Sequence, residues 1–134
     1  MRGQILLVLL LCVLASGGCG KRKSTEELIS DLKSLEEKDR LIAVRLLPQR
    51  KGAATPEIVR GMIASLKDHE ADIRWSAAIG LGYFGEGAKE AIPALQAAQH
   101  DRDARVREAA GVALSRIDPG RFPAPASKSR AGRG

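Results

Sequence analysis

Apolar residues recur at helical spacing through the middle of the chain, and short polar or helix-breaking stretches separate the apolar segments. In the clearest segment, apolar side chains fall at Ile73, Ala77, Leu81 and Phe84, which places them on one face of a helix. The chain shows no alternation of apolar and polar residues of the kind that favours a β-strand. We therefore expect short helices that each bury one stripe.

The same pattern occurs three times along the chain. Residues 91–118 align with residues 58–85 at an offset of 33, and a further shift of 34 finds a more degenerate copy in residues 24–51. Each unit contains two helices that are too short to be stable alone. Regular repetition of such a unit predicts an all-α fold, a short right-handed α-solenoid of about three helical hairpins.

Local signals indicate where the helices begin and end. Ser24-Thr25-Glu26-Glu27 has the residue order of a capping box, and Thr55-Pro56-Glu57 places a capping hydroxyl, a first-turn proline and a carboxylate in the preferred order. Gly85 and Asp118-Pro119-Gly120 are expected to end the second helices of two hairpins. The predicted repeats occupy residues 24–51, 55–85 and 88–118.

The third unit contains the series Ala91-Ile92-Pro93-Ala94-Leu95, Asp101 to Asp103, Val106-Arg107 and Ala109-Ala110 to Leu114. This series resembles a HEAT-type repeat, and more narrowly the short variety known from phycobilin lyases. The resemblance covers about three repeats, residues 24–118, although the first repeat has Asp39 where the others have an apolar residue. The resemblance implies a fold and says little about chemistry.

Arginines and acidic residues recur at equivalent places in the repeats and are candidate site residues. A paired catalytic set is one interpretation, but no base or nucleophile accompanies these side chains. The resemblance implies a structural ladder, in which each arginine closes a turn or bridges to an adjacent repeat. We expect no catalytic residue, no metal site and no cofactor. The ladder residues are Arg40, Arg74, Arg107, Asp68 and Asp101.

Trp75 stands at a position that the other repeats fill with Leu41 and Glu108, so the repeat itself does not require an aromatic residue there. Ile79 and Tyr83 follow at i+4 and i+8 and form a second apolar stripe beside the buried one. Two interpretations stay open. The stripe is a docking strip on the concave face, so that Trp75→Ala weakens partner capture more than folding, or it packs against flanking repeats.

Charge is distributed unevenly along the chain, although 22 basic and 16 acidic residues give a formal net charge of +6. All the acidic residues lie between residues 24 and 118, where 14 basic residues leave a balance of −2. Residues 119–134 are basic and rich in Pro, Gly, Ala and Ser, so we expect a disordered tail. A body that binds nucleic acid is expected to carry a basic stripe, and residues 24–118 have a slight excess of acid instead, so we expect no nucleic acid partner. We also expect no small-molecule substrate.

The first residues have the organisation of an export signal. Residues 1–4 carry one positive charge, residues 5–15 form an uninterrupted apolar run, and small residues come next. The stretch from Leu14 to Cys19 resembles a bacterial lipoprotein signal, with Ser16 where that family usually has a branched aliphatic residue. The resemblance implies a signal peptide over residues 1–18, acylation of Cys19, and a linker over residues 19–23. A retained anchor is the alternative, because Lys21-Arg22-Lys23 makes the downstream flank the more basic one.

These features together predict a non-enzymatic scaffold or adaptor that binds an unidentified protein on its concave face. We expect it to be exported and held in the bacterial cell envelope by its lipidated N-terminus, on the outer-membrane or periplasmic side where the envelope has two membranes. One alternative is a phycobilin lyase-type protein, suggested by the repeat resemblance alone and opposed by the export signal. A second alternative is a cytoplasmic nucleic-acid binder behind a retained anchor, whose affinity would depend strongly on salt.

Overall fold

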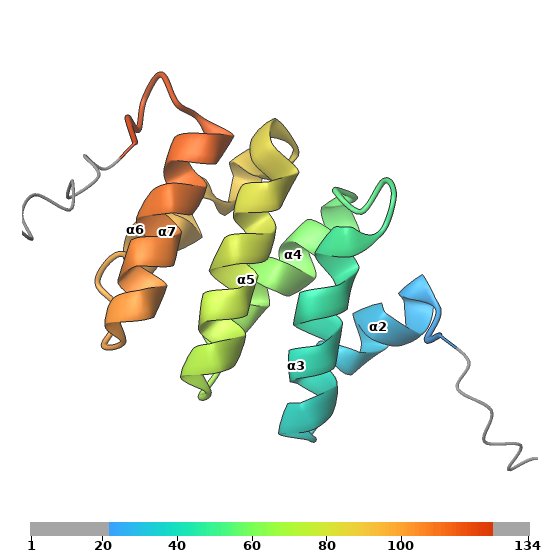
Figure 1. The fold of residues 1–134 in the computed structure, drawn as a ribbon. Coiled ribbons are helices and arrows are strands. Elements are labelled where there is room, and N and C mark those ends of the chain that lie inside the picture. The colour runs from blue at the N-terminus through green and yellow to red at the C-terminus, as the bar shows by residue number, and fades with distance from the viewer. Residues whose placement is uncertain (1–21, 125–134) are drawn as a thin grey trace, which may run out of the picture.

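A computed structural model describes residues 22–124, and within this range the chain is helical and contains no strand. Three hairpins follow one another, as the sequence predicts (Figure 1). The first elements of the hairpins are α2 (Thr25–Asp31), α4 (Pro56–Ser65) and α6 (Ile92–Ala98). The second elements are α3 (Glu37–Leu46), α5 (Ala71–Phe84) and α7 (Ala104–Ile117). Two 3₁₀ segments, η1 (Leu47–Gln49) and η2 (Gly85–Ala91), connect the hairpins.

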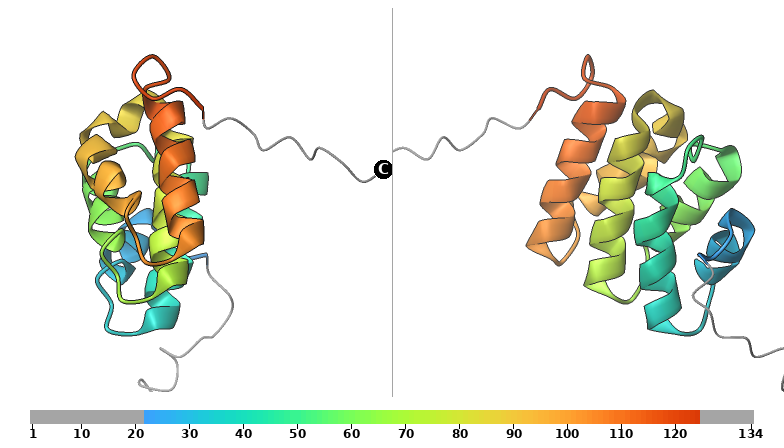
Figure 2. Two further views of the ribbon diagram at one scale, coloured as in Figure 1. Left: turned by 90° about the vertical axis from the view of Figure 1, so that its left-hand side faces the viewer. Right: turned by 45° about the vertical axis from the view of Figure 1, so that its right-hand side comes forward.

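The helices form two layers. Helices α3, α5 and α7 lie side by side in one layer, and α2, α4 and α6 lie behind them (Figures 1 and 2). Helix α5 contacts both α3 and α7, so the second hairpin is covered on both sides. This arrangement confirms the predicted all-α fold and makes the layer of second helices a continuous face of the molecule.

The predicted helix ends are present in the structure. Ser24 and Glu27 form a reciprocal capping box, with the Glu27 amide 3.1 Å from the Ser24 hydroxyl and the Ser24 amide 2.6 Å from the Glu27 carboxylate. Thr55 caps α4, and Pro56 occupies its first turn. Gly85 ends α5 with φ +52°, a region that favours glycine because a side chain there would be strained.

Apolar side chains between the two layers form the core. The stripe predicted on α5 is buried at Ile73, Ala77 and Leu81, but Phe84 is only partly buried because it lies at the last turn of the helix. Small residues set the spacing between second helices. A Cβ added to Gly82 would lie 3.1 Å from the Ala113 Cα, so α5 and α7 approach each other closely. Small side chains at this contact therefore allow the close packing of the two helices.

The ordered body extends beyond its predicted C-terminal boundary. The tail was expected to begin at Pro119, but the Phe122 amide donates to the Asp118 carbonyl at 2.9 Å and the Phe122 ring packs against the core. Burial of this aromatic ring favours an ordered turn over a solvated chain. At the N-terminal end, the Lys23 ammonium forms ion pairs with Asp31 at 2.7 Å and with Asp39 at 3.2 Å. Asp39 is the residue that replaces an apolar side chain of the other repeats, and this ion pair compensates its charge.

Several predictions concern residues outside the described range. The signal peptide over residues 1–18, the acylated Cys19 and residues 125–134 of the tail belong to this group. Among the helices built from residues 22–124, none is long and apolar enough to cross a membrane.

Candidate functional site

One edge of the molecule, where the turns inside the hairpins lie, carries the recurrent arginines. The Arg74 Nε and Nη2 atoms donate to the two Asp101 carboxylate oxygens at 2.8 and 3.0 Å, and Nη1 donates to the carbonyls of Asp68 and His69 at 2.8 and 2.9 Å. Only 5% of Arg74 is exposed. One side chain therefore closes its own turn and holds the turn of the next repeat.

Arg40 makes the same contacts one repeat earlier. Its Nε and Nη2 atoms donate to Asp68 at 2.7 and 3.2 Å, and its Nη1 atom donates to the carbonyls of Ser34 and Leu35, both at 3.0 Å. Bidentate pairs of this kind are among the strongest hydrogen-bonded contacts in proteins. The two ion pairs link the first repeat to the second and the second to the third.

The turn acids also bond to the backbone of their own turns. Asp101 accepts the Asp103 amide at 2.8 Å, and Asp68 accepts the Glu70 amide at 3.0 Å. The hydrogen bond from Arg74 lowers the pKa of Asp101, and burial opposes this effect only in part. Burial would raise the pKa of Asp68, but hydrogen bonds from Arg40 and the Glu70 amide bring that pKa below its usual value.

Arg40 and Arg74 each bind both an aspartate and two turn carbonyls, whereas Arg107 binds the carbonyls alone among the residues that the structure describes. Its Nη1 atom donates to the carbonyls of Asp101 and Arg102 at 2.8 and 3.1 Å, but within residues 22–124 no carboxylate pairs with it. Arg107 belongs to the last hairpin of the described range, so the structure contains no later hairpin turn that could supply an aspartate there. Its guanidinium is correspondingly exposed.

The side chains of the ladder are engaged by one another and by backbone groups. Asp68 and Asp101 are engaged by arginines and backbone amides, and the two histidines, His69 and His100, are exposed. Within the described range, no three His, Cys, Asp or Glu side chains converge in an arrangement that could hold a metal ion. These contacts have the character of a structural brace between repeats.

A different surface is formed by Trp75, Ile79 and Tyr83 on the layer of second helices. These three residues, called the α5 ridge below, run along the outward side of α5. Trp75 and Ile79 are partly buried against the core, whereas Tyr83 is 70% exposed. Each of the two interpretations left open by the sequence therefore holds for part of the ridge. Trp75 and Ile79 pack against the body, whereas the Tyr83 ring faces solvent.

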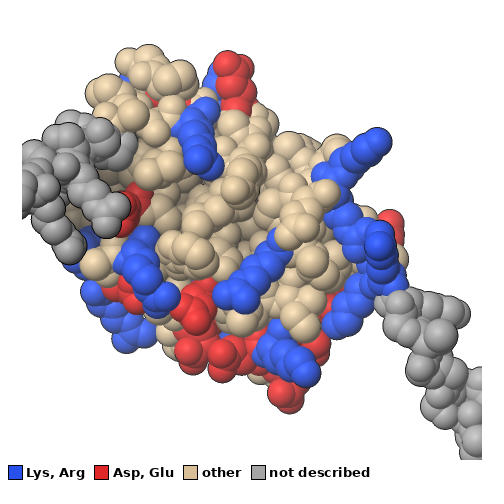
Figure 3. Space-filling model, in the orientation of Figure 1, with Lys and Arg blue, Asp and Glu red and all other residues tan. Residues whose placement is uncertain are grey.

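A groove lies on each side of the α5 ridge, and all three ridge residues line both grooves. The α3–α5 groove has a volume of about 520 Å³ and includes Pro48 and Arg45. The α5–α7 groove has a volume of about 350 Å³ and includes Val112 and Arg116. Figure 3 looks onto this face and shows a largely uncharged surface crossed by separate basic side chains. Acidic side chains gather at the lower edge of that view.

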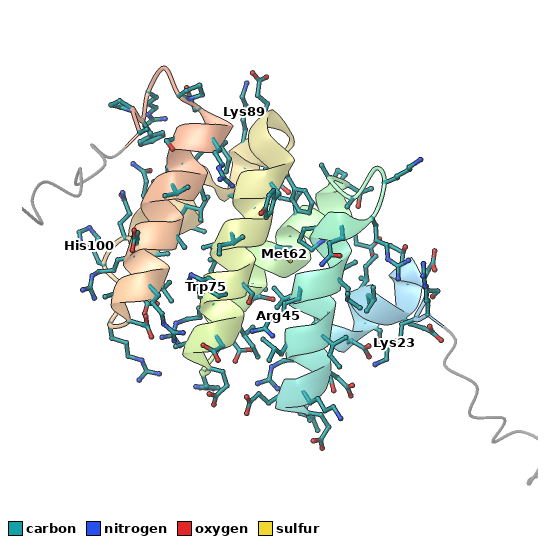
Figure 4. The ribbon with its side chains drawn as sticks, viewed as in Figure 1. Lys23, Arg45, Met62, Trp75, Lys89 and His100 are labelled. Atoms are coloured by element: carbon teal, nitrogen blue, oxygen red, sulfur yellow. The ribbon has the colours of Figure 1, made fainter. Side chains whose placement is uncertain are left out.

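Two arginines of these grooves were not among the predicted site residues. Arg45 extends from α3 toward α5, where its Nε atom lies 3.5 Å from the Ser76 hydroxyl (Figure 4). The Arg116 guanidinium lies over the Tyr83 ring, 5.4 Å from its centroid. The repeat offset of 34 carries Ile79 onto Arg45, and the offset of 33 carries Tyr83 onto Arg116. Comparison of ridge positions across all three repeats would have found both.

Comparison with known families agrees with this architecture. The sequence profile for HEAT repeats matches residues 25–115, which is more than half of the chain and spans all three hairpins. Comparison with the curated proteins finds no match. HEAT repeats generally mediate protein binding, and a two-layer stack of helical hairpins is the architecture expected of them. The chain therefore belongs to the HEAT repeat family.

Proposed function

We propose that this protein is a non-enzymatic binding module that captures a protein partner on the face formed by α3, α5 and α7. The observation that carries this proposal is the α5 ridge, an apolar strip with a groove on each side. Aromatic anchors next to pockets that can take a partner's side chains are typical of interface hot spots. Tyr83 is also one of the few large apolar side chains that the described residues leave exposed, and it lies next to both grooves.

Tyr83 is the residue on which this interpretation depends most. It is 70% exposed, and Arg116 lies over its ring at 5.4 Å. The guanidinium is attracted to the negative face of the ring, and most of the ring stays open to solvent. This contact favours one orientation of the ring, and an anchor that is already oriented loses less entropy on binding.

The non-enzymatic part of the proposal is supported by the ladder. Its acids and arginines are committed to each other and to backbone groups, with Asp101 and Arg74 joined through two hydrogen bonds. Groups held in this way stabilise the stack of repeats, and a reaction would have to break contacts that hold the fold.

Photocrosslinking in cells tests the docking face. A benzoylphenylalanine introduced in place of Tyr83 should give a discrete crosslinked product, since this position touches the partner. The same residue introduced in place of Arg60, which is exposed on α4 in the other layer, serves as the matched control and should not give that product. Equal products at both positions, or none at position 83, would overturn the proposal.

The proposed location is the bacterial cell envelope, with the body exported and held by an acylated Cys19. Support comes from the apolar run at residues 5–15 and the small residues that precede Cys19. A cysteine carrying several acyl chains anchors a protein firmly, whereas one chain binds only marginally. Cys19→Ala should release the protein from membranes or block its maturation. An intact mass that corresponds to an unacylated chain beginning at Met1 would contradict this location.

A further inference from the structure

The charge of the two grooves differs in sign from the charge of the repeat body. Three arginines and one glutamate line the grooves, namely Arg45, Arg105, Arg116 and Glu108. Residues 24–118 as a whole carry 14 basic and 16 acidic residues. A body with a small excess of acid thus presents a basic rim around its apolar ridge. Such separation of charge favours partners of the opposite sign.

Arg45 and Arg116 differ from the arginines of the ladder in what they contact. Within residues 22–124 neither forms an ion pair with a carboxylate, and the one hydrogen bond that the Arg45 side chain makes is the 3.5 Å contact with Ser76. A guanidinium has five N–H donors, so most of the donors of both side chains remain available. They flank the α5 ridge on opposite sides, Arg45 from α3 and Arg116 from α7.

The third arginine of the grooves is already occupied. Arg105 lies 3.0 Å from Asp72 and 3.1 Å from Asp103, which leaves less of its charge for a ligand. Glu108 contributes the opposite charge in the same α5–α7 groove. The positive character available to a partner therefore comes from two guanidinium groups, each next to an apolar surface.

We infer that the partner presents an acidic segment whose carboxylates flank large apolar side chains. This inference rests on the proposed function, because it assigns the chemistry of the partner that the α5 ridge would bind. Apolar side chains of the segment enter the two grooves beside Trp75 and Tyr83, and carboxylates on either side pair with Arg45 and Arg116. Arginine and carboxylate match in a planar, bidentate geometry, so the pairs select orientation as well as charge.

Other occupants fit these observations less well. The chain's own tail, residues 119–134, carries four basic residues and no acidic one, so the basic rim would repel it. A single-stranded nucleic acid stacks bases on aromatic rings but also needs a continuous basic groove along its backbone. Among the described residues only two unpaired arginines border the ridge, and acidic side chains gather at one edge of the face (Figure 3).

Selection from a random-peptide display library tests the inference with the full chain immobilised in detergent solution. Peptides retained by the protein should contain large apolar residues flanked by Asp or Glu. Synthetic copies should bind at least tenfold more weakly to Tyr83→Ala, and severalfold more weakly to Arg45→Gln and to Arg116→Gln. Binding should also weaken as salt is raised, and less steeply for the two glutamine variants. Arg60→Gln removes an exposed arginine from the other layer and should bind like the original protein.

The outcomes separate the inference from the proposed function. Neutral or basic peptides that depend on Tyr83 but not on Arg45 or Arg116 would overturn the acidic partner and leave the docking face standing. No enrichment over a parallel selection on Tyr83→Ala would overturn the docking face itself. A labelled single-stranded oligonucleotide provides a further arm, and tight binding that Arg45→Gln and Tyr83→Ala both weaken would assign the face to nucleic acid instead.

Discussion

Arginine makes two different kinds of contact on two surfaces of this molecule, and Arg74 and Arg45 illustrate the contrast. Arg74 is buried at the turn edge and directs four hydrogen bonds to a carboxylate and two carbonyls. Arg45 is exposed beside the α5 ridge and makes a single long contact with a hydroxyl. A buried guanidinium stabilises the fold only when its partners are complete, whereas an exposed one with unused donors can bind a ligand.

The largest effect is expected from breaking the buried side of this comparison. Arg74→Ala leaves Asp101 partly buried without its partner and removes the hydrogen bonds to two turn carbonyls. Removing one member of a buried pair typically costs about 3 to 5 kcal/mol of stability. Urea unfolding followed by circular dichroism should show a loss of this size.

Arg107→Ala is the matched control for that experiment. Arg107 occupies the equivalent position in the last repeat and keeps the carbonyl contacts, but it is exposed and has no carboxylate partner among the described residues. Its loss should be clearly smaller than that of Arg74→Ala. Equal losses would mean that the carbonyl contacts, and not the ion pairs, hold the turns.

Trp75 is partly buried against the core and also lines both grooves, so Trp75→Ala should affect both stability and binding. The indole is partly buried against the core, so we expect a loss of about 2 kcal/mol, below that of a fully buried tryptophan. A loss of this size would support both interpretations of the stripe, because it would show that Trp75 packs against the body as well as lining the grooves. Thermal unfolding of the variant measures the loss of stability. An unchanged unfolding midpoint would mean that the indole contributes to the binding surface of the α5 ridge and not to the core.

Acid should lower the stability of the fold by protonating the two aspartates of the ladder, Asp68 and Asp101. The pKa values of Asp68 and Asp101 lie below the usual value in the folded protein, so the unfolded chain binds more protons near pH 4. Stability is therefore fully present above about pH 4 and falls as the pH drops through the folded pKa values. The loss should be smaller than that of Arg74→Ala, because Arg74 keeps its carbonyl contacts.

Asp101→Asn provides the comparison for this acid effect. It removes one of the two titrating carboxylates while preserving the shape of the side chain. Urea unfolding at several pH values between about 2 and 6 should give a shallower pH dependence for the variant. An identical slope for both proteins would show that other carboxylates cause the acid sensitivity.

The smallest change in stability is expected from Tyr83→Ala. The ring is 70% exposed, and substitutions at exposed positions usually change stability by less than about 0.5 kcal/mol. An interface anchor, by contrast, typically contributes about 2 kcal/mol or more to binding. Thermal unfolding combined with the peptide-binding assay separates the two effects. A large fall in the unfolding midpoint would make Tyr83 part of the core and remove the main support for the docking face.

The turn edge was the more predictable of the two surfaces. Each hairpin repeats the same residue types at an offset of 33 or 34, so Arg40 and Arg74 could be matched with turn acids before any contact was known. The helix caps at Ser24 and Thr55 could also be predicted from the sequence, because a cap depends on residues only three positions apart. Arg107 has no carboxylate partner among residues 22–124, and this was harder to predict because periodicity alone does not say what packs against the last hairpin.

The sequence by itself determined the number of hairpins, their ends and the stripe of α5 that is buried at Ile73, Ala77 and Leu81. These features arise from helical periodicity and local capping, which act over a few residues. Only the tertiary structure decided which part of the α5 ridge is exposed, that grooves lie on both sides of it, and that Arg45 and Arg116 border them. Helical spacing assigns a residue to a face, but its exposure and its partners depend on how closely neighbouring helices pack. Small residues such as Gly82 and Ala113 set that distance.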